Sequence, residues 1–123
     1  MKALSLLLLL ISAVSVFGQA SDPGKTLFDT GTRDEQVGRL DRAKLTLLTM
    51  AATYPDHPLT SKAKVEIGAI YMFLEAQAQV QAGKISDGYG TFRTLMRVYP
   101  ESPLAKLADE TVKSLGIPAD PRR

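Results

Sequence analysis

The chain of 123 residues contains no cysteine and no tryptophan, and it has a single histidine, His57. The lack of cysteine excludes disulfide bonds, thiolate catalysis, cysteine-based metal sites and a lipid-bearing cysteine behind a leader. The chain also lacks a large net charge, because its 15 Lys and Arg residues are nearly balanced by 13 Asp and Glu residues. A chain so close to neutral is not expected to bind nucleic acid or an anionic membrane through its overall charge. We therefore expect neither partner.

The long apolar run of the sequence lies at its N-terminus. It follows Lys2 and extends from residue 3 to residue 17, interrupted only by serines. A basic start, about 15 apolar residues and a small-residue end are typical of a secretory signal peptide. We expect residues 1–20 to be this leader, with cleavage after Ala20 favoured over cleavage after Gly18. The alternative is an uncleaved anchor, although the run is shorter than the roughly 20 residues that a membrane span needs.

A repeat with an offset of 45 residues organises the remainder of the chain. The segment 54–59, Tyr-Pro-Asp-His-Pro-Leu, recurs at 99–104 as Tyr-Pro-Glu-Ser-Pro-Leu. The segment 38–40, Gly-Arg-Leu, recurs in the same register at 83–85 as Gly-Lys-Ile. Chance poorly explains two matching strings in one register. We infer a duplicated helix–turn–helix unit, because internal periods of this size mark repeat architectures.

Apolar residues in both copies recur at steps of three and four, which is typical of one face of an α-helix. They are Leu40, Ala43, Leu47, Met50, Ala51 and Tyr54 in the first copy, and Ile85, Gly88, Phe92, Leu95, Met96 and Tyr99 in the second. Pro55 and Pro100 follow these faces and end the helices, because the residue before a proline leaves the α region. The pattern predicts an all-α fold with five helices, near 23–37, 40–54, 58–82, 85–99 and 103–115. The helical domain would span 21–116, followed by a flexible tail at 117–123.

Two further prolines lie where the next helices should begin. Pro58 and Pro103 suit the first turn of a helix, where a missing N–H costs nothing. Ser102 is a good capping residue before Pro103. His57 occupies the equivalent place before Pro58, so we interpret it as a cap or turn residue rather than as a catalytic base or metal ligand.

The predicted helix 58–82 is apolar on two sides, which indicates a helix buried between two neighbours. One stripe consists of Ala63, Ile67, Ile70, Tyr71, Leu74 and Ala78, and the other of Val65, Ala69, Met72, Phe73, Ala76 and Val80. Lys64, Glu75 and Gln79 lie between the stripes, where they could contact a ligand. Met72 and Phe73 are interpreted mainly as core, with a partner groove as the alternative.

The two copies differ on the outer face of their second helix. The first copy carries Leu45, Leu48 and Ala52, and the second carries Gly90, Arg93 and Arg97 at the equivalent positions. Val65 and Ala69 are likewise replaced by Glu110 and Ser114. We expect the apolar set to be buried at a seam between repeats and the polar set to cap the end of the array. As an alternative, Arg93 and Arg97 form a basic pair that could dock an acidic partner.

These features resemble tandem tetratricopeptide (TPR) repeats. The small, aromatic, small-or-aliphatic and proline positions of the second TPR helix correspond to Ala43, Leu47, Met50 and Pro55, and then to Gly88, Phe92, Leu95 and Pro100. The Leu-Gly-x-x-Tyr string of the first helix corresponds to residues 67–71, Ile-Gly-Ala-Ile-Tyr. The repeat of 45 is longer than the usual 34. The resemblance implies a TPR-like superhelix of about two repeats with a capping helix, whose first helices, 23–37 and 58–82, line a binding groove.

Within that family, the sequence motifs of the repeats are similar to those of the BamD/YfiO-like lipoproteins that assemble outer-membrane proteins. They are also similar to those of the YbgF-like periplasmic proteins. The resemblance implies an exported scaffold in a Gram-negative envelope that binds a protein or peptide partner, without the lipidated cysteine. A self-associating accessory domain, and hence a homo-oligomer, is the alternative.

Residue types that carry chemistry do not gather into a known motif. His57 has no serine or cysteine partner in a recognisable pattern, and the acid pairs Asp34-Glu35 and Asp109-Glu110 are adjacent in sequence rather than spaced for a metal. We expect no enzyme, no cofactor and no small-molecule substrate. The candidate partner-binding residues are Lys64, Glu75, Gln79, Arg93, Arg97, Met72 and Phe73.

Overall fold

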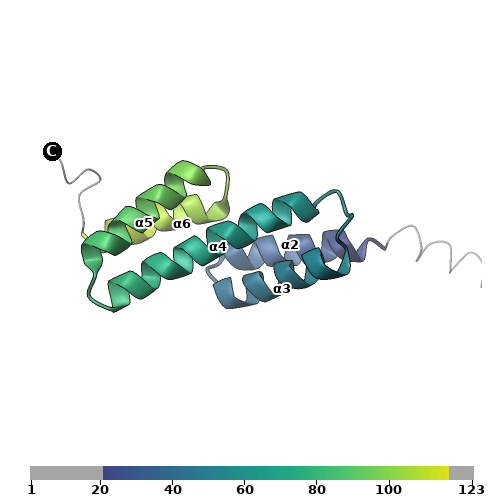
Figure 1. Cartoon of the computed structure of the whole chain (residues 1–123), viewed down its shortest axis with the longest axis horizontal. Helices are drawn as coiled ribbons and strands as arrows, with labels where there is room; N and C mark the ends of the chain where they lie inside the picture. Colours follow the sequence, from purple (N-terminus) through teal and green to yellow (C-terminus); the bar gives the residue numbers. More distant parts are fainter. Residues whose placement is uncertain (1–20, 117–123) are drawn as a thin grey trace, which may run out of the picture.

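The computed structural model describes residues 21–116, which form five α-helices and no strand (Figure 1). The helices are α2 (Pro23–Gln36), α3 (Leu40–Thr53), α4 (Thr60–Gln81), α5 (Ile85–Val98) and α6 (Pro103–Ser114). The expected all-α fold with five helices is confirmed. The predicted signal peptide 1–20 and the predicted tail 117–123 lie outside the described residues. No helix among residues 21–116 is long and apolar enough to cross a membrane.

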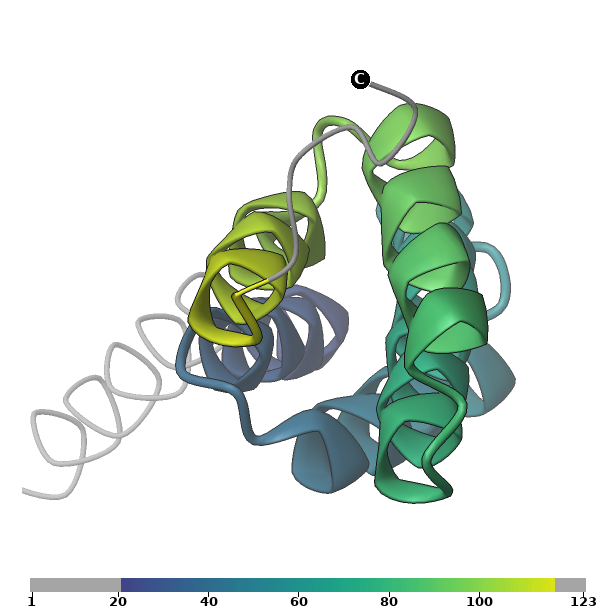
Figure 2. The ribbon, with the colours of Figure 1, turned by 90° about the vertical axis from the view of Figure 1, so that its left-hand side faces the viewer.

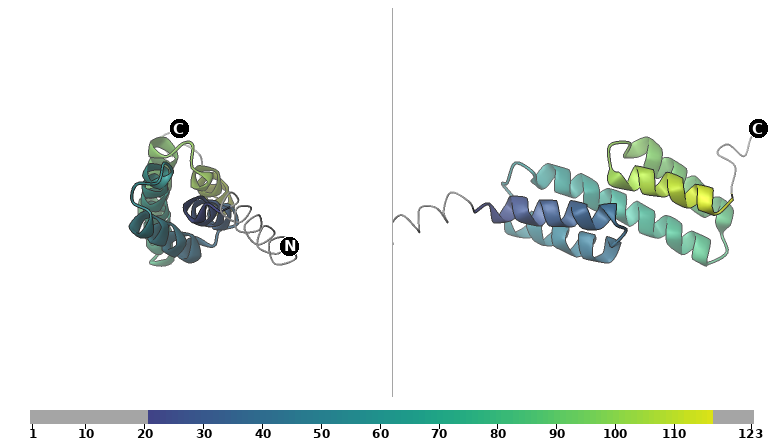
Figure 3. Two further views of the ribbon diagram at one scale, coloured as in Figure 1. Left: turned by 90° about the vertical axis from the view of Figure 1, so that its right-hand side faces the viewer. Right: turned by 180° about the vertical axis from the view of Figure 1, so that it is seen from behind.

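The long helix α4 runs through the middle of the molecule and contacts every other helix. α2 and α3 pack along its N-terminal half, and α5 and α6 pack along its C-terminal half (Figures 1 and 3). Viewed end-on, α2 and α6 lie on one side of the molecule and face α4 and α5 (Figure 2). α6 also contacts α2. The 45-residue repeat therefore corresponds to two three-helix units that share α4.

The two units repeat each other down to individual backbone hydrogen bonds. Gly38 donates to the carbonyl of Glu35 (3.1 Å), and Gly83 donates to the carbonyl of Val80 (3.0 Å). Both glycines end a helix with a positive φ, 79° and 83°, a region that other residues rarely adopt. The turns after α3 and α5 also match. The backbone N–H of His57 donates to the carbonyl of Tyr54, and the backbone N–H of Ser102 donates to the carbonyl of Tyr99. The sequence repeat is thus a structural repeat.

The core is continuous through both units and is built from the residues that the periodicity selects. Leu47 and Met50 of α3 and Phe92 and Leu95 of α5 are fully buried at equivalent positions. Phe73 of α4 packs edge-on against Phe92, with ring centroids 5.1 Å apart. Burial of aromatic and aliphatic side chains of this size supplies most of the favourable free energy of folding.

The start of the long helix differs from the prediction. α6 begins at Pro103 as expected, and the Ser102 side chain accepts a hydrogen bond from the N–H of Leu104 (3.1 Å). α4 begins at Thr60, and Pro58 lies in the turn before it. The Nδ1 atom of His57 accepts a hydrogen bond from the N–H of Leu59 (3.0 Å), which is the equivalent of the Ser102 bond. The interpretation of His57 as a cap or turn residue is confirmed, although the helix that follows starts later.

His57 also ties the turn to the beginning of α2. Its Nε2 atom lies 2.9 Å from Oδ1 of Asp22, the capping residue of α2. Because Nδ1 is an acceptor, Nε2 carries the proton and donates it to Asp22. The N–H of Lys25 and this bond from His57 hold the pKa of Asp22 below its usual value.

The prediction that Leu45, Leu48 and Ala52 are buried at a seam is wrong. All three are exposed on the outer face of α3, Leu45 to 67%. Tyr71 and Val65 of α4, expected in buried stripes, are also more than half exposed. The reason is that the described helices cover α3 from one side only, so its second apolar stripe faces outward. At these positions the contrast between the two copies is therefore not a contrast in burial, whereas Ala69 of α4 is buried as expected and its equivalent Ser114 of α6 is exposed.

Candidate functional site

A cavity of about 480 Å³ lies where the two units meet, and we call it the junction pocket. α2 and the N-terminal half of α4 form two of its walls, and the turn between α5 and α6 forms the third. Its lining residues are Phe28 and Thr32 of α2, Lys62, Val65 and Glu66 of α4, and residues 98–103. The pocket therefore depends on both units being in place, because α2 belongs to the first and the α5–α6 turn to the second.

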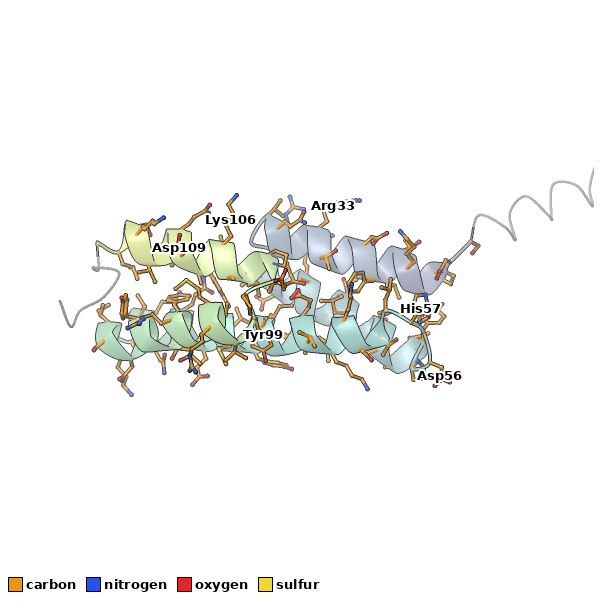
Figure 4. The ribbon with its side chains drawn as sticks, turned by 90° about the horizontal axis from the view of Figure 1, so that it is seen from above. Arg33, Asp56, His57, Tyr99, Lys106 and Asp109 are labelled. Carbon is orange, nitrogen blue, oxygen red and sulfur yellow. The ribbon has the colours of Figure 1, made fainter. Side chains whose placement is uncertain are left out.

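The walls of the junction pocket are mostly apolar. Phe28, Val65 and Val98 present hydrocarbon surface, and Pro100 and Pro103 add their rings. Tyr99, which also lines the pocket, lies near the middle of the molecule, between His57 on one side and Asp109 on the other (Figure 4). An apolar concavity with a few polar groups is the usual form of a ligand site.

Among the charged residues that line the pocket, Glu66 is the buried one, with 8% of its surface exposed, whereas Lys62 and Glu101 are exposed. The Ser102 hydroxyl donates a long hydrogen bond of 3.3 Å to Oε2 of Glu66. Among the ion pairs formed by residues 21–116, none involves Glu66. A carboxylate with this degree of burial is normally paired with a cation or accepts several hydrogen bonds. Glu66 therefore has unused capacity to accept hydrogen bonds.

Behind Glu66 lies a second carboxyl group, that of Glu35 at the end of α2, which is fully buried. Within the described chain, no N–H or hydroxyl group donates to either oxygen of Glu35. Burial raises the pKa of Glu35 to about 9, and repulsion by Glu66 and a hydrogen bond to it act in the same direction. Glu35 is thus protonated at neutral pH, and its O–H donates to the Glu66 carboxylate. The two side chains form a proton-sharing pair at the pocket.

A second, shallower hollow of about 510 Å³ lies between α4 and α5, and we call it the outer groove. Met72, Glu75 and Gln79 of α4 line one side, and α5 residues from Ser86 to Thr94 line the other. Oε1 of Gln79 accepts a hydrogen bond of 2.6 Å from the Thr91 hydroxyl. The groove is open beside Gly90, where an added Cβ would meet no atom within 4 Å.

The structure brings together three of the seven candidate residues and separates the others. Met72, Glu75 and Gln79 share the outer groove. Lys64 and Arg97 are exposed outside both hollows, and the Arg93 guanidinium lies over the ring of Tyr89 at 5.8 Å.

Phe73 is 2% exposed and packs in the core, so a partner cannot reach it in this conformation. The interpretation of Phe73 as core holds, and its alternative role in a partner groove is wrong. Met72 is half-buried, consistent with its place at the edge of the outer groove.

The sequence analysis missed the acid pair of the junction pocket, although the sequence carried a signal for Glu66. Glu66 lies three residues after Ala63 and four before Ile70, at the centre of a stripe that was expected to be buried. Glu35 is equivalent to Val80 in the 45-residue repeat, so an acid stands where the other copy has an apolar residue. A charged residue at a core position of an amphipathic helix is a candidate functional residue.

In comparisons with known proteins, no family model, curated protein or solved structure matches the chain.

Proposed function

We propose that this protein is an exported, TPR-like interaction scaffold that holds a segment of a partner protein in the junction pocket. The observation that carries the proposal is the pocket itself, which is apolar, is large enough for one or two side chains and is built from both units. α2 and α4, which line it, are the helices that the TPR resemblance assigns to the binding groove. Val98, Pro100 and Glu101 of its lining are exposed, so a partner chain can contact the pocket there and insert a side chain.

The cellular setting of this proposal comes from the sequence. The apolar run before residue 20 supports export. The similarity of the repeat motifs to those of BamD-like proteins supports a role in outer-membrane protein assembly. A YbgF-like adaptor of the cell envelope is the alternative setting. Both settings require a partner protein.

A self-associating domain is a second candidate, and one observation favours it. Leu45, Leu48 and Ala52 form an exposed apolar stripe on α3, and Tyr71 of α4 lies nearby with the Lys44 ammonium over its ring at 5.4 Å. Exposed apolar surface of this kind marks contact sites. Sedimentation at increasing concentration, with Leu45→Lys as the matched variant, separates a monomer from a dimer that forms through α3.

A hydrolase would use an acid pair beside a cleft, and Glu35 and Glu66 form such a pair. In glycoside hydrolysis, both carboxyl groups contact the substrate on opposite sides of the bond that breaks. Glu35 is fully buried behind Glu66, and its oxygens are hidden from solvent. The geometry therefore supports binding in preference to hydrolysis.

The proposal is tested by selecting peptides from a random display library on the purified domain. Val98 lines the junction pocket and is half exposed, so Val98→Trp fills the pocket from its rim with little effect on the core. Leu45→Trp is the matched control, because it adds the same side chain to an exposed site outside the pocket.

We expect selected peptides to bind the unmodified protein and Leu45→Trp alike, and to bind Val98→Trp about tenfold or more weakly, which corresponds to about 1.4 kcal/mol. Equal binding to all three proteins, or no selection of peptides at all, would contradict the proposed function.

A further inference from the structure

The lining of the junction pocket combines apolar and acidic residues. Phe28, Val65 and Val98 line it with hydrocarbon, whereas Glu66, which also lines it, is a carboxylate residue with 8% of its surface exposed. A ligand group that fits must be apolar along its length and must end in a hydrogen-bond donor. Lysine and arginine side chains have this form, because a chain of methylene groups carries a charged head.

The acid pair has a deficit of hydrogen-bond donors that such a head would supply. Glu66 accepts the long bond from Ser102 and the proton of Glu35, and both oxygens of Glu35 lack a donor from another described residue. A guanidinium or ammonium group at Glu66 would form charge-assisted hydrogen bonds, which are about twice as strong as neutral ones. It would also reduce the repulsion that keeps the second carboxyl group from ionising.

We propose that the junction pocket is a recognition site for a basic side chain, lysine or arginine, of the partner segment, with Glu66 as the group that binds its charged head. The inference rests on the proposed function and names the chemistry of the residue that the pocket holds. Phe28, Val65 and Val98 would pack against the methylene stem. Glu101, which also lines the pocket, adds a second negative charge, so the two acids Glu66 and Glu101 outnumber the one cation Lys62 in the lining.

Charged groups around the pocket determine how binding depends on pH. Lys62 of α4 and Glu101 of the α5–α6 turn line it, and Glu35 of α2 contacts Glu66 from behind. Asp34 precedes Glu35 in α2 and is also buried. Its Oδ2 atom lies 4.0 Å from Nε of Arg42 on α3. Of these groups, Glu35 holds a proton at neutral pH that an incoming cation would displace. Binding of the cation therefore releases a proton and strengthens as pH rises towards 9.

The test uses two small probes of the same shape and different charge, n-butylguanidinium and n-butylurea. Each is titrated into the domain while the methyl resonances of Val65 and Val98 are followed by NMR. We expect n-butylguanidinium to produce saturable shifts at both valines and to bind about tenfold more tightly than n-butylurea.

The variant Glu66→Gln keeps the shape and the Ser102 hydrogen bond but removes the charge, so the preference for the cation should disappear. Glu75→Gln, in the outer groove, is the matched control and should leave the preference unchanged. A second measurement repeats the titration at about pH 6 and about pH 8. Affinity for n-butylguanidinium should rise in the unmodified protein and stay level in Glu35→Gln.

Equal affinity for the two probes, or a cation preference that survives in Glu66→Gln with a folded spectrum, overturns the inference. These outcomes are distinct from failure of the proposed function. If library peptides bind in a Val98-dependent manner without a conserved basic residue, the function stands and the basic anchor is wrong. If no peptide depends on Val98, the pocket is not a peptide site at all.

Discussion

The hydroxyl group of Tyr99 occupies the space that a side chain on Gly68 would need. A Cβ added at Gly68 would lie 2.7 Å from the Tyr99 oxygen, closer than real Cβ contacts allow. Gly68 is in the middle of α4, where glycine costs about 1 kcal/mol relative to alanine. Gly68 therefore lowers the stability of α4 but leaves room for the Tyr99 ring, which forms part of the junction pocket wall.

Gly68→Ala should move Tyr99 and reshape the pocket at little net cost in stability. The gain in helix propensity, about 1 kcal/mol, offsets the cost of displacing the ring. We expect the free energy of unfolding to change by less than about 1 kcal/mol, whereas the ring resonances of Tyr99 shift and n-butylguanidinium binding weakens.

Gly90→Ala serves as the control, because no atom lies within 4 Å of the added Cβ. It should raise stability by about 0.5–1 kcal/mol and leave Tyr99 unmoved. A Gly68→Ala protein with an unchanged Tyr99 spectrum would show that the ring does not depend on the glycine.

Stability should fall as pH rises, because Glu35 holds its proton in the folded state up to about pH 9 and loses it near its ordinary value of 4.5 when unfolded. Between these two values the folded state binds more protons than the unfolded state, so the free energy of unfolding decreases with pH. The contribution is fully present below about pH 4.5, and its slope is at most about 1.4 kcal/mol per pH unit.

Glu35→Gln keeps a hydrogen-bond donor towards Glu66 without a titrating proton. We expect urea unfolding at about pH 5 and about pH 8 to show a smaller loss of stability in this variant than in the unmodified protein. Glu75→Gln, at an exposed position of α4, should retain the full loss. The same slope in all three proteins would assign the pH dependence to other groups.

Leu47→Ala and Phe92→Ala should each destabilise the fold by about 2–5 kcal/mol, since both side chains are fully buried at equivalent positions of the two units. Phe92→Ala should lie at the upper end of this range, because it also removes the edge contact with Phe73. Denaturant unfolding measures both values. A change below about 1 kcal/mol in either variant would contradict the assigned core.

Leu48→Arg should be tolerated, contrary to what a buried seam would require. Leu48 is 39% exposed on the outer face of α3, so a longer side chain can extend into solvent. We expect a change in unfolding free energy within about 0.5 kcal/mol, similar to that of Arg93→Leu at the equivalent position of α5. Loss of folding in Leu48→Arg alone would restore the seam and require a further surface to cover α3.

The helices and the repeat could be predicted from the sequence because they depend on local signals. Pro55 and Pro100 ended their helices, and the periodicity selected Leu47 and Phe92 as core. The outer stripe of α3 was predicted wrongly for a physical reason: apolar spacing shows which residues share a face, but not whether a neighbour covers that face. Leu45 and Leu48 share a face that no described helix covers.

The site was harder to predict than the fold because it joins residues far apart in the chain. Glu35 and Glu66 meet only when α2 packs on α4, and Ser102 reaches Glu66 only when the second unit is in place. The position of Glu66 within an apolar stripe was the readable signal, whereas its pairing with Glu35 required the tertiary structure.

The shared helix α4 has a consequence for how the molecule comes apart. In a linear array in which no helix is shared between repeats, a terminal repeat can unfold while the rest stays folded. Here each three-helix unit needs α4, so melting at either end removes a helix that the other end requires. Loss of structure should therefore be cooperative across the whole domain, with the thermal transitions of Tyr54 at one turn and Tyr99 at the other coinciding.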